Sequence, residues 1–240
     1  MGEARQAPGF FGKLPSHGDF LARRLPPEVR LCFDHWLQQG LVQSRIDLGE
    51  AWLPAWLGSP LWRFVVAAGI CGEQAWAGVM MPSHDRVGRC FPLLLMAASD
   101  GTPSLADCMR LHDGWFARLE AMALSTLEEG FSLEALDAGL MALGGLPPAT
   151  DSPDGRAAPA AKIDDCACEA RRAGELPALA LVAPGEGRSA WWTDGAQHVA
   201  PCLAVCRGLP APTGFAALLD GRLAQRGWAW THGDAGIPPE

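Results

Sequence analysis

Apolar residues recur at helical spacing in several parts of the chain. After a Pro-Pro pair at 26–27, which suits the first turn of a helix, apolar positions repeat every three or four residues up to Gly49. The widest apolar stripe begins at Thr102 and continues to Leu127. The predicted helices cover residues 27–49, 52–57, 102–127, 132–144 and 213–219.

Short apolar runs between these segments predict β-strands, because Gly, Pro and polar turn residues bound them. The predicted strands cover residues 10–14, 61–68, 75–81, 91–98, 178–182, 189–193 and 199–206. The run 91–98 is continuously apolar, which is typical of a strand that is buried on both faces. Short connections between 61 and 98 favour an antiparallel meander, since parallel pairing would need a long crossover. The pattern therefore predicts an α/β fold with a mostly antiparallel sheet.

Residues 146–176 interrupt this pattern with a stretch rich in Pro, Ala, Asp and Gly that has little periodicity. Such a stretch has little apolar area to bury, so we expect a flexible insertion there. The segments after it are too few to form a core of their own. We therefore expect a single α/β domain over residues 1–240, with an N-terminal core at 8–145 that is completed by 177–230.

Composition narrows the class of protein. The 240 residues are 49% hydrophobic and 19% charged, which is typical of a globular chain. A formal charge of -8 and a pI near 5.2 argue against nucleic acid or an anionic membrane as a partner, because both need a basic face. Neither a membrane-spanning run nor a signal-peptide pattern is present. We expect a cytoplasmic protein without direct membrane insertion, whose eight cysteines are reduced.

Two loops, at residues 13–20 and 82–92, concentrate polar side chains next to predicted strands. Their candidate residues for binding a partner or ligand are Lys13, Ser16, Asp19, Ser83, Asp85, Arg86 and Arg89. One interpretation is a pair of recognition loops that a rigid scaffold holds in place. The other is that neighbouring arginines and aspartates satisfy one another as internal ion pairs. The sequence leaves both open.

The same loops suggest an enzymatic alternative. Ser83, His84 and Asp85 are consecutive, so their side chains point in different directions and cannot converge as a catalytic triad. A cleft built from Ser16, Asp19, Asp85 and Arg86 stays possible for a hydrolase or a small-ligand binder. However, the chain has no Gly-x-Ser-x-Gly nucleophile elbow. We predict no catalytic residue.

Cysteine spacing suggests zinc only weakly. Cys202 and Cys206 lie four apart in a predicted strand, which separates them by roughly 13 Å, too far for one metal ion. Cys166, Cys168 and His198 are the other possible ligands of the zinc hypothesis. The cysteines of this set are better explained as small buried hydrophobic residues. We predict neither a metal nor a cofactor.

Adjacent Trp62 and Arg63 in a predicted strand must point to opposite faces of the sheet, and so must Trp191 and Trp192. An outward Trp62 or Trp191 would be an interface anchor, since Trp and Arg are enriched at binding hot spots. In the alternative, helices cover both faces of the sheet. Trp62 and Arg63 are therefore further candidates for partner binding.

These segments, taken in order, resemble the TagF (ImpM) family of type VI secretion-associated proteins. The resemblance rests on segments spread over most of the chain: GFFGKLP at 9–15, GDF at 18–20, SPLWRF at 59–64, GVMMPS at 78–83, DRVGR at 85–89, FP at 91–92, WWT at 191–193, GLP at 208–210 and LLDG at 218–221.

The resemblance implies a three-layer α/β sandwich with a central, mostly antiparallel sheet flanked by helices. It also implies a cytoplasmic, non-catalytic regulator that represses type VI secretion post-translationally. The implied partner is the forkhead-associated scaffold protein of that system. We expect residues 13–20, Trp62–Arg63 and residues 85–89 to lie close together as a partner-facing surface. A structural accessory subunit of the secretion apparatus is the second non-enzymatic alternative.

Overall fold

The computed structural model describes residues 6–99, 101–147, 166–171, 175–181 and 187–230. Its strands are β1 (Gly9–Gly12), β2 (Leu21–Arg23), β3 (Trp62–Val66), β4 (Ala75–Met81), β5 (Leu93–Ser99), β6 (Cys166–Ala170), β7 (Arg188–Thr193), β8 (Cys202–Arg207) and β9 (Ala229–Trp230). Its α-helices are α1 (Pro27–Leu48), α2 (Trp52–Leu57), α3 (Leu105–Arg110), α4 (Asp113–Ser125), α5 (Leu133–Leu143), α6 (Ala178–Leu181) and α7 (Ala217–Asp220). Short 3-10 helices are η1 (Gly49–Ala51), η2 (Pro212–Gly214) and η3 (Ala224–Arg226).

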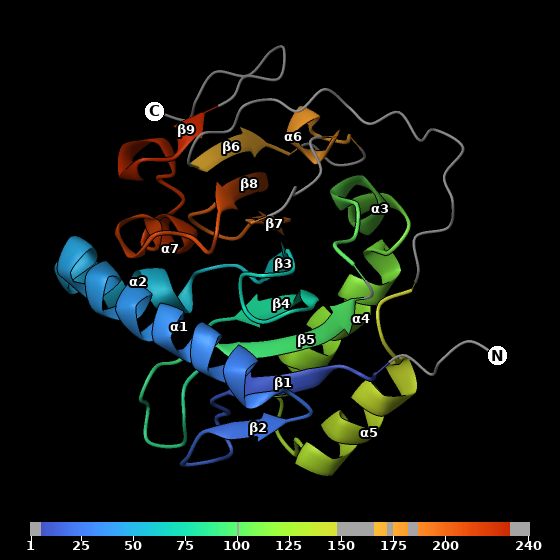
Figure 1. The fold of residues 1–240 in the computed structure, drawn as a ribbon. Helices are drawn as coiled ribbons and strands as arrows, with labels where there is room; N and C mark the ends of the chain where they lie inside the picture. The colour runs from blue at the N-terminus through green and yellow to red at the C-terminus, as the bar shows by residue number, and fades with distance from the viewer. Residues whose placement is uncertain (1–5, 100, 148–165, 172–174, 182–186, 231–240) are drawn as a thin grey trace.

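The strands form one sheet in the order β2-β1-β5-β4-β3-β7-β8-β6-β9 (Figure 1). Neighbouring strands pair antiparallel throughout, except that β6 and β9 are parallel. The predicted meander is present as β3-β4-β5, whose connections are too short for a parallel crossover. The predicted α/β fold with a mostly antiparallel sheet is confirmed.

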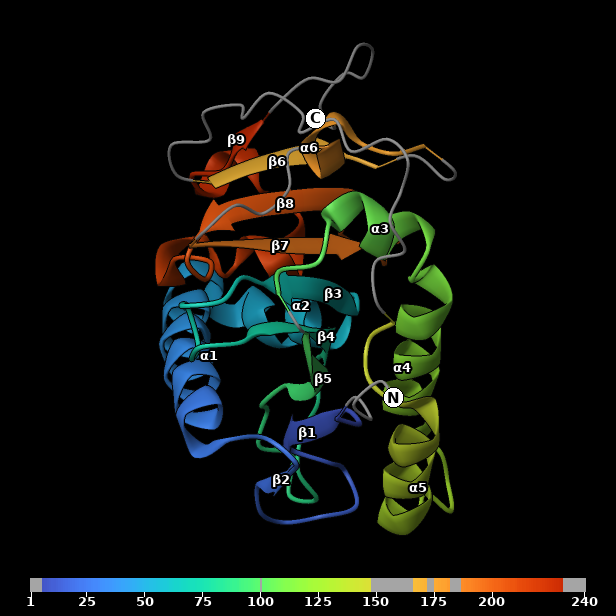
Figure 2. The ribbon, with the colours of Figure 1, turned by 45° about the vertical axis from the view of Figure 1, so that its right-hand side comes forward.

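Helices pack on both faces of this sheet (Figure 2). On one face, α1, α2 and α7 bury an aromatic core in which the Trp36 and Phe64 rings each lie 5.0 Å from Trp191. On the other face, α3, α4 and α5 cover the strands, and Phe116 of α4 packs edge-on against Trp192 at 4.9 Å. The alternation of side chains along each strand thus fills two separate hydrophobic cores.

Of the two alternatives for Trp62 and Trp191, the structure has the one in which helices cover both faces of the sheet. Trp62 is 1% exposed, and its Nε1 donates a hydrogen bond to the Leu218 carbonyl of α7 at 3.0 Å. Trp191 is fully buried, and its Nε1 donates to Ser189 Oγ at 2.9 Å. Each indole therefore finds its polar partner inside the protein, as buried tryptophans usually do.

The single helix predicted over 102–127 is wrong, because the chain turns between α3 and α4. Ser104 caps α3 by accepting a hydrogen bond from the Asp107 amide. The amides of Leu111 and His112 both donate to the Asp107 carbonyl, which ends that helix. His112 then precedes the first turn of α4.

Two predictions in the second half of the chain are also wrong. Residues 166–170, placed in the expected insertion 146–176, form strand β6, which pairs with β8 and β9. Residues 178–181 are helical, not extended, because the carboxylate of Glu169 in β6 accepts hydrogen bonds from the amides of Ala178 and Leu179 at 3.1 and 2.9 Å. The rest of the expected insertion falls largely outside the described residues, at 148–165 and 172–174.

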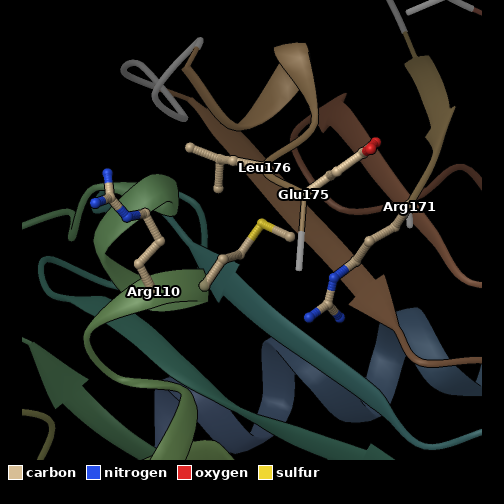
Figure 3. A pocket seen from close by; sticks show the side chains of 5 residues that line it. Arg110, Arg171, Glu175 and Leu176 are labelled. Atoms are coloured by element: carbon tan, nitrogen blue, oxygen red, sulfur yellow. The ribbon is translucent and has the colours of Figure 1, made fainter. Parts of the chain in front are cut away.

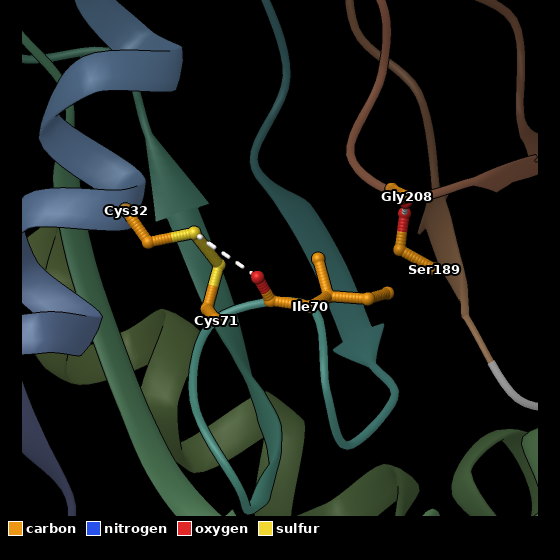
Figure 4. Close-up of a disulfide and its surroundings, with 5 residues drawn as sticks. All are labelled: Cys32, Ile70, Cys71, Ser189 and Gly208. Atoms are coloured by element: carbon orange, nitrogen blue, oxygen red, sulfur yellow. Dashed lines mark hydrogen bonds between the residues drawn. A yellow bond between two sulfur atoms is a disulfide. The ribbon is translucent and has the colours of Figure 1, made fainter.

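The expectation of eight reduced cysteines is wrong for two of them. Cys32 of α1 and Cys71, in the turn between β3 and β4, form a disulfide with a Cα–Cα distance of 5.5 Å (Figure 4). Cys90, Cys108, Cys166, Cys168, Cys202 and Cys206 are not part of this disulfide. The two partners are 39 residues apart in sequence, and only the packing of α1 over this face brings them together.

In the described part of the chain, no helix combines the length and apolar character that crossing a membrane requires.

Candidate functional site

The two polar loops lie side by side at one end of the sheet. Residues 13–20 join β1 to β2, and residues 82–92 join β4 to β5. They meet because β1 pairs with β5, with Gly12 opposite Leu93. The Arg86 amide donates to the His17 carbonyl at 2.9 Å, so the contact extends into the loops themselves. We call these two segments the paired loops.

Gly12 allows the close approach of the two segments. Its φ is 139°, which side-chain-bearing residues rarely adopt. A Cβ atom at this position would lie 2.0 Å from the Pro92 carbonyl oxygen. Gly12, the second glycine of the GFFGKLP segment, is therefore required at the end of β1, where the first loop begins and the end of the second loop lies against it.

Asp85 is the centre of the paired loops and is fully buried. Its Oδ2 accepts hydrogen bonds from Lys13 Nζ at 2.9 Å and Arg89 Nε at 2.6 Å. Its Oδ1 accepts from the amides of Val87 and Arg89 at 3.0 and 2.9 Å. One carboxylate thus closes the second loop on itself and binds it to the first.

Burial alone raises the pKa of the Asp85 carboxyl. The hydrogen bonds from Lys13, from the Arg89 amide and side chain, and from the Val87 amide outweigh that effect, and they hold the pKa well below its ordinary value. Asp85 is therefore ionised at neutral pH, and its charge is compensated by two cations from different parts of the paired loops.

Lys13 and Ser83 complete the buried set of hydrogen-bonded residues around Asp85. The Lys13 side chain is 8% exposed, and its Nζ lies 5.0 Å from the centre of the Phe20 ring, within cation–π range. Ser83 Oγ donates to the Lys13 carbonyl at 2.8 Å. Lys13, Ser83 and Asp85 therefore contact one another inside the protein, and of the arginine–aspartate pairs that the sequence suggested the structure contains Arg89–Asp85.

Other residues of the paired loops face solvent. The exposed set, which we call the loop tip, comprises Ser16, Asp19, Phe20, Arg86, Val87 and Arg89. Phe20 is 49% exposed and Val87 is 69% exposed. These two apolar residues were missed by the sequence analysis. The sequence property that could have indicated their exposure is that each lies in a turn-rich loop, outside the periodic pattern of any helix or strand.

The side chains of the enzymatic alternative do not converge on an open pocket. Asp85 is sealed from solvent, and Ser16 Oγ lies 2.8 Å from Nδ1 of the neighbouring His17. The His84 Nδ1 atom lies 2.9 Å from the Asp85 carbonyl oxygen and so is directed to the backbone. Ser16 therefore contacts His17 at the surface, and Asp85 contacts Lys13 and Arg89, so the residues of this cleft are directed to separate neighbours.

A pocket of about 390 Å³ lies elsewhere, and its lining residues are Met109, Arg110, Arg171, Glu175 and Leu176. In Figure 3 the guanidinium of Arg110 and the carboxylate of Glu175 point away from each other. Arg171 is already paired with Asp194 at 2.5 Å. The polar groups around this pocket therefore do not form a convergent set, and none of them comes from the paired loops.

Arg63 is the buried cation of a second ion cluster, on the face of the sheet that α4 covers. Its Nε and Nη2 donate to the two oxygens of Glu120 at 2.7 and 2.8 Å, which is a bidentate pair. Its Nη1 donates to Asp113 at 2.6 Å, and Asp194 lies 3.3 Å from Nη2. Burial lowers the pKa of this guanidinium, but the three carboxylates more than offset that, so it stays charged.

The expectation that Trp62 and Arg63 form one surface with the two loops is wrong. β4 and β5 separate β3 from β1, which places Trp62 about three strand spacings, or about 14 Å, from Phe11 of β1. Trp62 and Arg63 are 1% and 4% exposed, because β3 lies inside the sheet and helices cover both of its faces.

The cysteines of the zinc alternative lie on one face of β6 and β8, where Cys166 is opposite Cys206. Burial raises the pKa of Cys168 and of Cys202 to about 12. These side chains are therefore neutral thiols at physiological pH, which suits packing better than metal binding.

The paired loops and Arg63 all fall in the part of the chain that matches a known family. The model of the TagF N-terminal domain, which is type VI secretion system-associated, matches residues 9–143. This chain belongs to the TagF family. It is thus a type VI secretion-associated protein, and strands β6 to β9 of this TagF protein lie beyond the matched domain.

A solved structure supports the same assignment over nearly the whole chain. The TagF protein is similar to the crystal structure of PA0076 from Pseudomonas aeruginosa PAO1, with 35% sequence identity and a TM-score of 0.75. The similarity covers 97% of this chain and 100% of PA0076. A comparison with curated proteins found no match.

Proposed function

We propose that this TagF protein is a cytoplasmic, non-catalytic regulator that represses type VI secretion post-translationally. It acts by binding the forkhead-associated scaffold protein of the secretion system. Membership of the TagF family carries this proposal, because the matched domain contains the paired loops complete. The binding surface is the loop tip, with the buried residues Lys13, Ser83 and Asp85 holding it in position.

The geometry of the paired loops supports binding over catalysis. Catalysis needs reactive groups that point at a shared space, whereas the buried charges here are satisfied by one another. A binding surface instead needs exposed side chains on a backbone that does not move much when the partner docks. The exposed loop tip on its hydrogen-bonded base meets that requirement.

Secretion by the host strain tests the repressor function. We expect deletion of the gene to increase type VI secretion and complementation with the wild-type gene to restore repression. Transcript levels of the secretion genes should stay unchanged, because the proposed action follows protein synthesis. Abolished secretion would instead identify a structural subunit of the apparatus.

A direct binding measurement tests whether the forkhead-associated protein is the partner. Purified TagF protein should bind the purified forkhead-associated protein in isothermal titration calorimetry, without any added nucleotide or metal. Absence of binding, combined with unchanged secretion in the deletion strain, would contradict the proposal.

A further inference from the structure

Building on the proposed function, we propose that the loop tip docks an acidic segment of the forkhead-associated partner that also carries an apolar side chain. The proposal depends on three properties of the paired loops: their charge, the placement of two arginines, and two exposed apolar side chains.

The charge of the paired loops differs in sign from that of the whole chain. They contain three cationic residues, Lys13, Arg86 and Arg89, and two acidic ones, Asp19 and Asp85, for a formal charge of about +1. The complete chain carries -8. The net charge of the chain therefore disfavours the approach of an acidic segment, whereas the exposed Arg86 and Arg89 attract one locally, which favours both encounter and orientation at this end.

Two guanidinium groups flank Gly18 at the surface. Arg89 Nη2 donates to the Gly18 carbonyl at 2.6 Å, and Arg86 Nη2 lies 3.9 Å from where a Cβ of Gly18 would be. Arg89 directs its Nε to Asp85, which fixes its orientation. Arg86 has no ion-pair partner within the residues that the structure describes. It is therefore available to bind a carboxylate through its planar set of donors.

Phe20 and Val87 add an apolar contact beside these arginines. The Phe20 ring lies 4.8 Å from Phe91 in an edge-on arrangement and 5.9 Å from Phe11, so half of it is packed and half is open to a partner. Val87 is held at the turn by its amide hydrogen bond to Asp85. Little conformational entropy is lost when such fixed side chains bind, which increases affinity.

Charge also favours one of the macromolecules that could bind the loop tip over the others. A nucleic acid would need a basic surface that extends beyond the loops, but the remainder of the chain is acidic. A second copy of this chain would bring the same cationic loop tip to a two-fold interface, where like charges would face each other. An acidic segment of a different protein avoids both problems.

Binding of single-residue variants to the purified forkhead-associated protein tests the docking site. We expect Arg86→Glu to weaken binding by about tenfold or more and to reduce the dependence of Kd on salt, because it reverses an unpaired cation at the interface. Val87→Ser should weaken binding by about threefold through loss of apolar contact. The matched control is Arg118→Glu, which makes the same change of charge at an exposed position of α4.

The outcomes separate the docking site from the proposed function. If the wild-type protein binds and represses, and Arg86→Glu does so equally well, the docking site is wrong and the function stands. Equal losses for Arg86→Glu and Arg118→Glu would show a general charge effect, which also overturns the docking site. If light scattering shows a wild-type dimer that Arg86→Glu dissociates, the occupant is a second copy. Circular dichroism and thermal unfolding of each variant verify that the fold is intact.

Discussion

Two buried charges in this protein are neutralised in opposite ways. Arg63 is a buried cation surrounded by carboxylates from α4 and from the end of β7, which we call the Arg63 cluster. Asp85 is a buried anion bound by Lys13 and Arg89, which we call the Asp85 cluster. The first cluster ties a helix to the middle of the sheet, whereas the second ties one loop to another.

The difference shows why a buried ion pair is not by itself a sign of function. Arg63 lies inside the sheet, and its carboxylate partners come from α4 and from the residue that follows β7. Around Asp85 the backbone that the cluster orders continues directly into the exposed residues Arg86 and Val87. Stability should therefore depend mainly on the Arg63 cluster, and partner binding mainly on the Asp85 cluster.

The largest expected effect comes from Cys71→Ser, which disturbs neither cluster and so provides the reference for plain destabilisation. The disulfide precedes β4 while the second loop follows it, so they are separated by about 23 Å of strand. Loss of a bond between residues 39 apart should lower the free energy of unfolding by about 4 kcal/mol in urea denaturation. Dithiothreitol should destabilise the wild type similarly and leave Cys71→Ser unchanged. Equal stability of the wild type, the wild type in dithiothreitol and Cys71→Ser would show that the disulfide contributes nothing to the free energy of unfolding.

Arg63→Met should have the next largest effect, a loss of about 3 kcal/mol in the free energy of unfolding. It leaves Glu120 and Asp113 without their cation, although their side chains are 22% and 51% exposed and can be partly hydrated. Arg63→Lys should lose less, because it keeps the charge but not the bidentate geometry. Binding of the forkhead-associated protein should be unaffected at temperatures where the variants are folded. A specific loss of binding would break the distinction between the clusters.

Asp85→Asn should have a smaller effect on global unfolding but a clear local one. The variant loses the charge that binds Lys13 and Arg89, so the paired loops should open more often. Hydrogen exchange at the Val87 and Arg89 amides, which donate to Asp85, should become faster, while exchange in β3 and α4 stays slow. Uniform acceleration across the protein would mean that the Asp85 cluster supports the whole fold.

Acid titration distinguishes the same two clusters. The pKa of Asp85 is lower in the folded protein than its ordinary value of 3.8, so its stabilising contribution is complete above pH 3.8 and is lost as the pH falls further. Asp85→Asn should therefore flatten the fall in stability below pH 3.8. The Arg63 guanidinium remains charged throughout this range. In Arg63→Met, the free energy of unfolding should therefore still fall below pH 3.8 through the protonation of Asp85.

The smallest effect on stability is expected for Arg86→Glu and Val87→Ser. Both side chains are exposed, so the free energy of unfolding should change by no more than about 0.5 kcal/mol. Their effect should appear in partner binding alone. A large loss of stability in either variant would mean that the loop tip is part of the structural base and not separate from it.

Much of the fold is predictable where the local pattern is strong. The helical period of α1 and the short connections of the β3-β4-β5 meander depend on residues close in sequence. Strand β6 and helix α6 were missed because each depends on the other. The Glu169 side chain caps α6 only after β6 has joined the sheet, and neither segment has a clear period of its own.

The sequence by itself determined the family, the α/β class and the two loops that hold the candidate site, because ordered motifs and local periodicity are properties of neighbouring residues. Only the tertiary structure decided which side chains of those loops face inward. Lys13 and Asp85 are 72 positions apart and meet because β1 pairs with β5, and this contact leaves Arg86 and Val87 exposed. Pairing between distant strands also enclosed Trp62 and Arg63, since burial depends on what covers a residue and not on its sequence neighbours.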